Sequence, residues 1–439
     1  MTGTISIAGV SEDTAVSFIA AMKGISGAGI SFTPDVTNLL PLNSRLTFEG
    51  DSITRGSNGP AFIEFVIFFT RGRYFCPHGY NQGFGGDTAE NMATAAEISL
   101  VTATNPKVVV LMSGINDLKG TSDTPATIFA NQRTAIEAYQ AAGAHVVHIC
   151  TLKSIDPQFT SLGTQRELDR QALRQLQLQQ TDVSLVDLEA IWDPTTMTIT
   201  NSATDTGLHP NYLGAMTIGQ AVANLLNTLI VADDPVKHSF DATNLMLAAD
   251  NPQFVGTAGG VVAADGVTGV APTQWTLDQT ANSGLTVTGV ATTLNGNNAL
   301  EITVSGTSAV ATLVTLRNVI NFSGDAAGDV YEAWWDFEVS DTQNLALLSV
   351  ASGTTTTMPI TAVNANSNYP DGSQFAGVAR TAAASPNPSS PTNQPAAVVS
   401  NGSLTSISSA FQISFPAGVE CGGTFTVAAP FLGRVPADA

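Results

Sequence analysis

Four short polar clusters in the sequence hold side chains that are suited to acyl transfer. Two of them supply the hydroxyl of Ser52 and the imidazole of His209, and the carboxylate of Asp205 lies close to the histidine in the sequence. A histidine that is oriented by a carboxylate can take the proton of a serine, which makes the serine a nucleophile. The other two clusters, the glycine-rich run 81–88 and the turn around Asn116, offer N–H groups to an oxyanion. Each cluster alone is also typical of a turn or a helix cap, but the set predicts nucleophilic catalysis.

In their order and spacing the four clusters resemble the signature motifs of the GDSL/SGNH hydrolase family. The family's nucleophile falls on Ser52 in Gly-Asp-Ser-Ile, and its base falls on His209 in Leu-His-Pro-Asn. Its oxyanion residues fall on Gly86 in Gly-Gly-Asp-Thr and on Asn116 in Gly-Ile-Asn-Asp. The resemblance covers about residues 42–231, which is less than half of the chain.

The resemblance implies an esterase mechanism with an acyl-serine intermediate. His209 takes the proton of Ser52 as the hydroxyl attacks an ester carbonyl. The oxyanion is held by the backbone N–H groups of Ser52 and Gly86 and by the side-chain amide of Asn116. Water activated by His209 then releases the acyl group. This chemistry needs no metal and no other cofactor.

One position departs from the family pattern. The aspartate of the family usually stands three residues before the histidine, where this chain has Thr206. We assign Asp205 as the third catalytic residue, because one residue of slack, provided by a turn at Gly207, lets its carboxylate reach His209. Two alternatives stay open: a Ser–His dyad without a carboxylate, and a carboxylate from elsewhere, such as Asp193.

The elements that must position these residues are alternating strands and helices. Five stretches are typical of strands, at 45–49, 74–76, 107–113, 144–151 and 183–187. Five are typical of helices, at 61–70, 88–104, 126–142, 164–180 and 213–229. Alternation of this kind predicts a parallel sheet with ligands at the carboxyl ends of its strands. We therefore expect a flavodoxin-like three-layer α/β/α fold, which the family resemblance also implies.

The composition changes after about residue 233, where Gly, Thr, Val, Ser and Asn become dominant. Short runs at 284–290, 299–304, 309–316 and 345–350 are separated by turn residues, which is typical of antiparallel sheets. The sequence thus predicts an α/β hydrolase domain at 42–232 and an all-β, jelly-roll-like sandwich at 233–439. The sandwich is expected to resemble carbohydrate-binding modules. Residues 1–41 form an N-terminal segment to which no role is assigned.

Three tryptophans in the β region have two possible roles. Trp275, Trp334 and Trp335 can stack on sugar rings, or they can belong to the core of the sandwich. Because side chains alternate along a strand, one of the adjacent pair Trp334 and Trp335 should point inward and the other outward. The segment 244–275 also resembles the opening of β modules in bacteriophage tail and virion proteins.

The charge of the chain restricts its partners. The 439 residues include 36 acidic and 16 basic side chains, which gives a formal net charge of −20. So negative a surface repels nucleic acid and anionic membranes, and no apolar run reaches the roughly 18 residues that span a bilayer. No secretory signal is visible at the N-terminus. We therefore expect an extracellular or virion-associated protein, which is either a mature secreted form or is released by lysis.

The histidines and cysteines outside the motifs suggest no further chemistry. His145 and His148 share a predicted strand but face opposite sides of it, and His78 stands apart, so no metal site is expected. The sparse set of cysteines is more typical of buried apolar side chains than of disulfides: Cys76, Cys150 and Cys421.

The substrate is predicted from the family and from the appended region together. A β module beside an esterase favours an acetylated polysaccharide as substrate and partner, with O-acetyl esters as the bonds that are hydrolysed. A lipid or thioester hydrolase of the same family is the first alternative. A non-catalytic receptor-binding or structural virion protein is the second. Whether the chain forms a homo-oligomer or part of a virion stays open.

Asp205 and Thr206 can be separated by a pair of substitutions. Asp205→Ala should lower turnover by roughly 10²–10⁴-fold, because the imidazolium loses a charged partner. Thr206→Ala should be nearly silent, because a hydroxyl carries no charge. Ester hydrolysis across a range of pH measures both effects. The reverse pattern would assign the role to the threonine, and two silent variants would indicate a dyad or a carboxylate from elsewhere.

Overall fold

The computed structural model describes most of the chain. The described residues are 39–56, 60–76, 80–120, 123–159, 162–200, 207–233, 235–248, 250–321, 326–352, 357–359, 371–372, 374–380, 398–401 and 406–434. The predicted catalytic residue Asp205, its neighbour Thr206 and almost all of the segment 1–41 lie outside them.

The first part of the described chain is built on a six-stranded sheet in which every pairing is parallel. Five strands run in the order β2-β1-β4-β5-β6, and β3 also pairs with β1. Their bounds are β1 (Ser44–Gly50), β2 (Tyr74–Phe75), β3 (Asn81–Gly83), β4 (Val108–Met112), β5 (His145–Ile149) and β6 (Val183–Val186). The central position of β4 explains its apolar sequence, since all five of its residues are buried.

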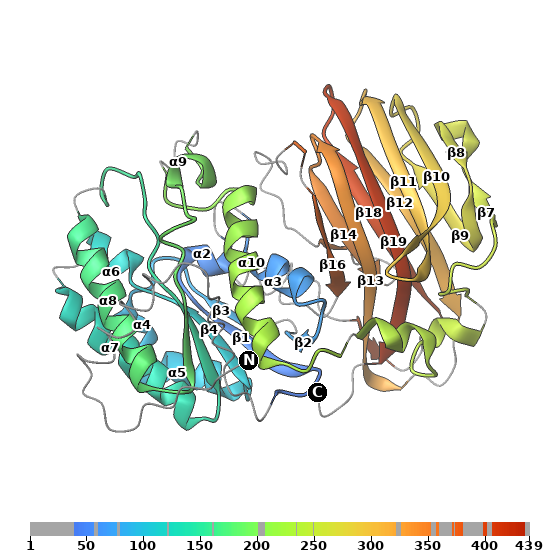
Figure 1. Ribbon diagram of the computed structural model, residues 1–439. Helices are drawn as coiled ribbons and strands as arrows, with labels where there is room; N and C mark the ends of the chain where they lie inside the picture. The colour runs from blue at the N-terminus through green and yellow to red at the C-terminus, as the bar shows by residue number, and fades with distance from the viewer. Residues whose placement is uncertain are drawn as a thin grey trace, which may run out of the picture. The chain divides into compact units, whose positions relative to one another are not determined.

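Helices cover both faces of this sheet (Figure 1). They are α2 (Ser52–Arg55), α3 (Ile63–Phe69), α4 (Ala89–Met92), α5 (Ala95–Ala103), α6 (Ile115–Gly120), α7 (Pro125–Ala141), α8 (Gly163–Gln179), α9 (Pro194–Met197) and α10 (Tyr212–Leu229). Neighbouring residues of β4 belong to different cores: Val110 shares one with Ile218 of α10, and Leu111 shares another with Ile136 of α7. The predicted α/β fold with a parallel sheet is thereby confirmed.

The helix predicted at 88–104 is wrong in one respect, because the chain forms two helices there. The first, α4, ends at Met92, and the backbone N–H of its C-cap, Ala93, donates to the carbonyl of Ala89. Thr94 then adopts an extended conformation, and its hydroxyl accepts the backbone N–H of Glu97 at 3.3 Å. A threonine in this position is a favourable N-cap, so a new helix begins where the periodicity alone indicates continuation.

The rest of the described chain is rich in strands, as predicted. One sheet has the order β16-β13-β19-β11-β10-β8 with β17 on β13, and the other has the order β15-β14-β18-β12-β9-β7. Most pairings are antiparallel, but β8 pairs with β10, and β7 with β9, in parallel. The jelly-roll connectivity and the domain bounds 42–232 and 233–439 stay predictions.

The bounds of the elements in this region are as follows. The strands are β7 (Ala258–Val261), β8 (Val267–Gly269), β9 (Ala271–Gln279), β10 (Leu285–Leu294), β11 (Asn297–Thr307), β12 (Thr312–Asn321), β13 (Ala327–Gln343), β14 (Leu347–Ser352), β15 (Thr357–Pro359), β16 (Phe375–Arg380), β17 (Val398–Asn401), β18 (Ser406–Phe415) and β19 (Glu420–Arg434). Three short 3-10 helices precede or interrupt them: η2 (Pro235–Phe240), η3 (Leu245–Ala248) and η4 (Ala263–Asp265).

The three tryptophans of this region are all core residues, so the sugar-stacking alternative is wrong for them. Trp275 and Trp335 are fully buried, with ring centroids 5.0 Å apart in an edge-to-face arrangement. Trp334 belongs to a separate cluster, as the alternation along β13 predicts, and its ring stacks on that of Phe431. It is only 4% exposed, because Val236 and Phe240 of η2 pack in the same cluster.

No helix within the described residues is long and apolar enough to cross a membrane. The three cysteines are buried and none forms a disulfide within the described residues, which agrees with their expected role as apolar side chains. Each of the two histidines of β5 contacts a serine: His145 lies next to Ser184, and His148 lies next to Ser113.

Trp334 provides a test of the cluster beneath η2. Trp334→Ala should lower the free energy of unfolding by about 3–5 kcal/mol, because it removes a large buried ring and leaves a cavity. Urea unfolding followed by far-UV circular dichroism measures this change. Val319→Ala is the matched control, since Val319 is 53% exposed and its truncation should cost little. Equal losses in the two variants would show that the cluster contributes no stability.

Candidate active site

Ser52 lies in a tight connection between β1 and α2. Asp51 is the N-cap of α2, and its carboxylate accepts the backbone N–H of Ile53 at 2.8 Å. Glycine is required just before it, because a Cβ at Gly50 would lie 2.2 Å from Oγ1 of Thr54 and 2.7 Å from the carbonyl oxygen of Met112. This close packing turns the chain sharply and presents the Ser52 hydroxyl at the carboxyl end of β1.

The hydroxyl oxygen of Ser52 lies 2.8 Å from Nε2 of His209. This is hydrogen-bond distance, and it joins residues that are 157 positions apart in the sequence. The predicted nucleophile and base are therefore in contact. With Nε2 as acceptor, the imidazole is placed to remove the serine proton.

The chain around His209 is fixed on both sides. Gly207 has a φ of +110°, and a Cβ there would lie 2.2 Å from Cγ1 of Ile155, so both the conformation and the space require glycine. The carbonyl of Gly207 accepts the hydroxyl of Ser154 at 2.8 Å. After the histidine, Asn211 caps α10 by accepting the backbone N–H of Gly214. His209 is thus held between the segment that follows β5 and the start of α10.

The third catalytic residue stays a prediction, because Asp205 lies outside the described residues. The alternative carboxylate has another role: Asp193 is the N-cap of α9 and accepts both the backbone N–H and the hydroxyl of Thr195, at 3.0 and 2.7 Å. Asp193 is exposed, whereas the ring of His209 is 7% exposed. Asp193 therefore has a capping role in α9, and Asp205 stays the predicted third residue.

The two predicted oxyanion residues follow the strands on either side of β1. Gly50 is opposite Gly83 of β3 and opposite Met112 of β4, so the carboxyl ends of three strands meet at one edge. Gly86 has a φ of +93°, and a Cβ placed there would have no atom within 4 Å. The space above Gly86 is therefore open to a reacting group.

Asn116 is held beside Gly86. Its side-chain nitrogen donates to the backbone carbonyl of Asp87 at 2.9 Å. An amide nitrogen carries two N–H groups, so the second one can serve an oxyanion. Asp117, which the sequence analysis did not single out, strengthens this arrangement, because its carboxylate accepts the backbone N–H of Ala89 at 2.9 and 3.0 Å.

Three carboxyl groups of the motif segments have raised pKa values: Asp51 and Asp117 are buried, and Asp87 is half-buried. Burial raises the pKa of Asp51 to about 7, although the hydrogen bond from Ile53 and the charge of His209 lower it in part. Burial, with the charge of Glu97, raises the pKa of Asp87 to about 6. Burial also raises the pKa of Asp117. The site therefore carries less negative charge near neutral pH than the number of its carboxyl groups indicates.

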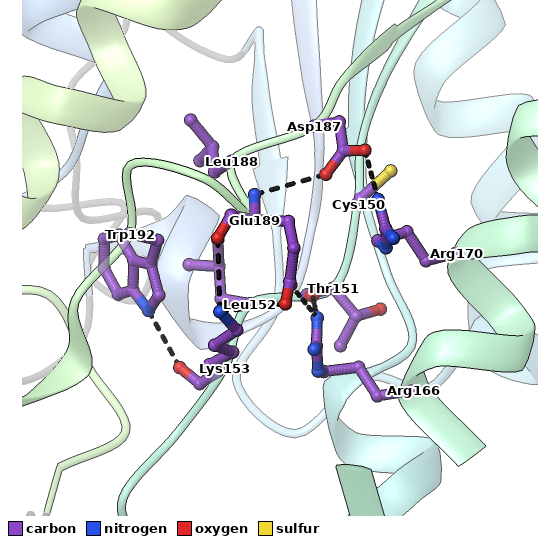
Figure 2. A pocket seen from close by; sticks show the side chains of 10 residues that line it. All are labelled: Cys150, Thr151, Leu152, Lys153, Arg166, Arg170, Asp187, Leu188, Glu189 and Trp192. Atoms are coloured by element: carbon purple, nitrogen blue, oxygen red, sulfur yellow. Dashed lines mark hydrogen bonds and ion pairs between the residues drawn. The ribbon is translucent and has the colours of Figure 1, made fainter. Parts of the chain in front are cut away.

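A small pocket at the carboxyl ends of β5 and β6 is separate from this site (Figure 2). Its charged side chains form ion pairs: Glu189 contacts Arg166 and Lys153, each at 2.8 Å. The indole N–H of Trp192 donates to the carbonyl of Lys153 at 2.8 Å. These contacts fix the segment just before Ser154 and thereby support the loop of His209.

Comparison with known proteins agrees with this geometry. Residues 48–216 match the GDSL-like Lipase/Acylhydrolase family. No curated protein matches the chain. The α/β part of the chain is thus similar to acylhydrolases of the GDSL type.

Similar solved structures include several esterases. A family 3 carbohydrate esterase from Talaromyces cellulolyticus is 19% identical, and the match covers 42% of this chain and 96% of that one, with a TM-score of 0.34. An acetylxylan esterase from Geobacillus stearothermophilus is 18% identical, with 45% and 100% covered and a TM-score of 0.34. A family 3 carbohydrate esterase from Clostridium thermocellum is 16% identical, with 44% and 100% covered and a TM-score of 0.34.

Asp51 gives the site a testable dependence of stability on pH. Its pKa rises from the ordinary 3.8 to about 7 in the folded protein. The folded state therefore binds the proton more tightly, and the free energy of unfolding falls by about 1.4 kcal/mol per pH unit across that window. Asp51→Asn keeps an acceptor for Ile53 but cannot ionise, so the variant should lose the share of Asp51 and show a shallower slope than the wild type, in which Asp87 and Asp169 also contribute. Urea unfolding at pH 4.5 and pH 7 measures it, and identical slopes would contradict the assignment.

Proposed function

We propose that this GDSL-type acylhydrolase is a serine esterase that removes short acyl groups, most of all O-acetyl groups, from a polysaccharide. The observation that carries the proposal is the 2.8 Å contact between the Ser52 hydroxyl and Nε2 of His209. It supplies an activated nucleophile at the sheet edge where the two oxyanion donors also lie. A non-catalytic role would give no reason for this contact.

The reaction follows from the positions of these groups. Ser52 Oγ attacks the ester carbonyl while His209 takes its proton, and the carbonyl oxygen becomes an oxyanion that accepts N–H groups of Gly86 and Asn116. The tetrahedral intermediate then collapses, and the alcohol departs with the proton from His209. The acyl group stays on Ser52 as an ester. A water molecule, deprotonated by His209, attacks this ester. The carboxylic acid is released, and the hydroxyl of Ser52 is restored.

The surroundings of Ser52 support a short acyl group. Among the described residues of the oxyanion loop, Gly85 and Gly86 are exposed and Asp87 is half-buried. A long acyl chain needs a groove lined with several apolar side chains. Phe84, which is 39% exposed, supplies one such side chain in this loop. A single ring next to the oxyanion glycines fits an acetyl group on a sugar better than a fatty acid.

The charge of the chain favours a carbohydrate over a lipid. A formal net charge of −20 opposes approach to anionic membranes. A lipid or thioester hydrolase is therefore the second candidate. Since Trp275, Trp334 and Trp335 are buried, a stacking face for sugars is offered instead by Phe84.

We also propose that the enzyme acts outside the cell, on a bacterial surface polymer, either secreted or as part of a virion. The likeness of the segment 244–275 to bacteriophage modules supports this location. In that setting the β-rich region would attach the enzyme to the polymer or to the particle.

Substitution of the nucleophile tests the proposed reaction. Ser52→Ala should lower the hydrolysis of p-nitrophenyl acetate by at least about 10³-fold, because no other group can form the acyl-enzyme. Ser99→Ala, a matched change at an exposed serine of α5, should have no effect. Equal activity in the two variants would remove Ser52 from the mechanism.

The acyl chain and the substrate require a second measurement on the wild-type enzyme. The proposal is supported if the enzyme hydrolyses p-nitrophenyl acetate much faster than the butyrate and octanoate esters. It also requires that the enzyme release acetate from acetylated polysaccharides. Highest activity on octanoate would favour the lipid alternative. Activity on none of the esters would favour the non-catalytic alternative.

A further inference from the structure

We propose that Gln132, Thr151 and Asp169 form a buried network that positions the oxyanion donor Asn116 by fixing the peptide before it. This inference rests on the function proposed above, since it assigns these three residues a role in that reaction. They come from α7, from the end of β5 and from α8, and they contact neither Ser52 nor His209. They are therefore positioning residues.

The turn between β4 and α6 decides where Asn116 lies. The strand ends at Met112, and α6 begins at Ile115, so only two residues connect them. The second of these, Gly114, has a φ of +107°, a conformation that glycine adopts readily. Because the connection is so short, the orientation of the Ser113–Gly114 peptide sets the direction of the first turn of α6. Asn116 lies in this turn, so the same peptide sets the position of its side-chain amide.

The network holds this peptide by its carbonyl. The Ser113 carbonyl accepts the hydroxyl of Thr151 at 3.0 Å and the side-chain amide of Gln132 at 3.5 Å. Oδ2 of Asp169 lies 3.3 Å from the Gln132 nitrogen and 3.4 Å from the Thr151 hydroxyl. Asp169 thus contacts both donors, which fixes the two side chains that hold the Ser113 carbonyl.

The hydrogens of the network can be assigned consistently. Thr151 has one hydroxyl hydrogen, which its shorter contact directs to the Ser113 carbonyl. Oδ2 of Asp169, at 3.4 Å, is the second acceptor within reach of this hydrogen, and burial raises the pKa of Asp169 to about 7. Gln132 has two N–H groups, one for each acceptor. Asp169 thus accepts from both side chains that also donate to the Ser113 carbonyl.

The network also packs directly on the turn. A Cβ at Gly114 would lie 2.7 Å from Oγ1 of Thr151 and 3.1 Å from Nε2 of Gln132. On the other side of the peptide, the Ser113 hydroxyl lies 3.1 Å from Nε2 of His148, whose pKa is lowered to about 3 by burial, so that the ring stays neutral. The turn therefore has little freedom to move.

Thr151 is itself anchored through its backbone. Its backbone carbonyl accepts a hydrogen bond from Nη1 of Arg166 at 3.3 Å. The same guanidinium forms an ion pair with Glu189 in the pocket of Figure 2. The ion pairs of that pocket therefore contribute to the position of the Thr151 hydroxyl.

The burial of these polar side chains points to a specific role. Gln132 and Asp169 are 1% exposed and Thr151 is 3% exposed, beside the apolar cluster that includes Leu111 and Ile136. Burying a polar group opposes folding unless its hydrogen bonds are made. Apolar side chains at these positions would avoid the free-energy cost of burying polar groups. We therefore assign the polar side chains the role of orienting the turn.

Thr151→Val tests the network with almost no change in shape, because a methyl group replaces the hydroxyl. We expect kcat on p-nitrophenyl acetate to fall roughly tenfold, with KM within about twofold, because the oxyanion donor acts in the transition state. Thr47→Val is the matched control: Thr47 is a buried threonine of β1 whose hydroxyl contacts Thr104 at 2.6 Å, away from the turn. The control should keep its kcat, and the melting temperatures of both variants verify that they fold.

A double-mutant cycle with Asn116→Ala shows whether Thr151 acts through the amide. Asn116→Ala alone should lower kcat by roughly 10²–10³-fold. In that background Thr151→Val should cause almost no further loss, because the group that it positions is already absent. A merely structural role would lower kcat by the same factor in both backgrounds.

The outcomes separate this inference from the proposed function. If Ser52→Ala is inactive but Thr151→Val keeps its kcat, or raises KM alone, the network has no positioning role and the esterase assignment stands. Losses that multiply in the cycle overturn the inference in the same way. If the wild type hydrolyses none of the esters, or Asn116→Ala is fully active, the proposed oxyanion site fails and the network's role fails with it.

Discussion

The parallel pairing of β1 with β3 and β4 is the constraint on which the predicted active site depends. Gly50 is paired with Gly83 on one side and with Met112 on the other, so three strands end at the same level. The turns that follow these strands carry Ser52, Gly86 and Asn116. A shift of one residue in either pairing would move an oxyanion donor by more than 3 Å, because a strand rises about 3.3 Å per residue.

The site also depends on polar groups that are buried at a cost to stability. Asp51 and Asp169 are almost inaccessible, and burial raises the pKa of each to about 7. His148 is buried in neutral form beside Ser113. Such groups oppose folding unless they are paired, and they restrict the conformations of the turns that they contact. The apolar cores on both faces of the sheet offset this cost.

The parts of the fold that were predicted correctly have strong local signals. The stretch 107–113 indicated a strand, which is β4 of the structure, and Ser52 and His209, which the motifs predicted to react together, lie 2.8 Å apart. The break at Thr94 was missed, because a cap changes the backbone without changing the apolar pattern. Gln132 and Asp169 were missed as well, since polar residues on amphipathic helices usually face solvent. Their burial depends on how α7 and α8 pack, which no short pattern specifies.

The segment η2 has a consequence for how this chain can exchange parts with other proteins. Its residues pack with Trp334, and its Ser239 hydroxyl donates to the carbonyl of Ala429 at 2.7 Å. The connection after α10 is therefore part of the fold of the β-rich region. A gene fusion that joined the β-rich region to another enzyme directly at β7 would lack η2. Trp334 would then be exposed, and the carbonyl of Ala429 would lose the hydrogen bond from Ser239. A junction placed before Pro235, which leaves η2 with the β-rich region, would keep both contacts.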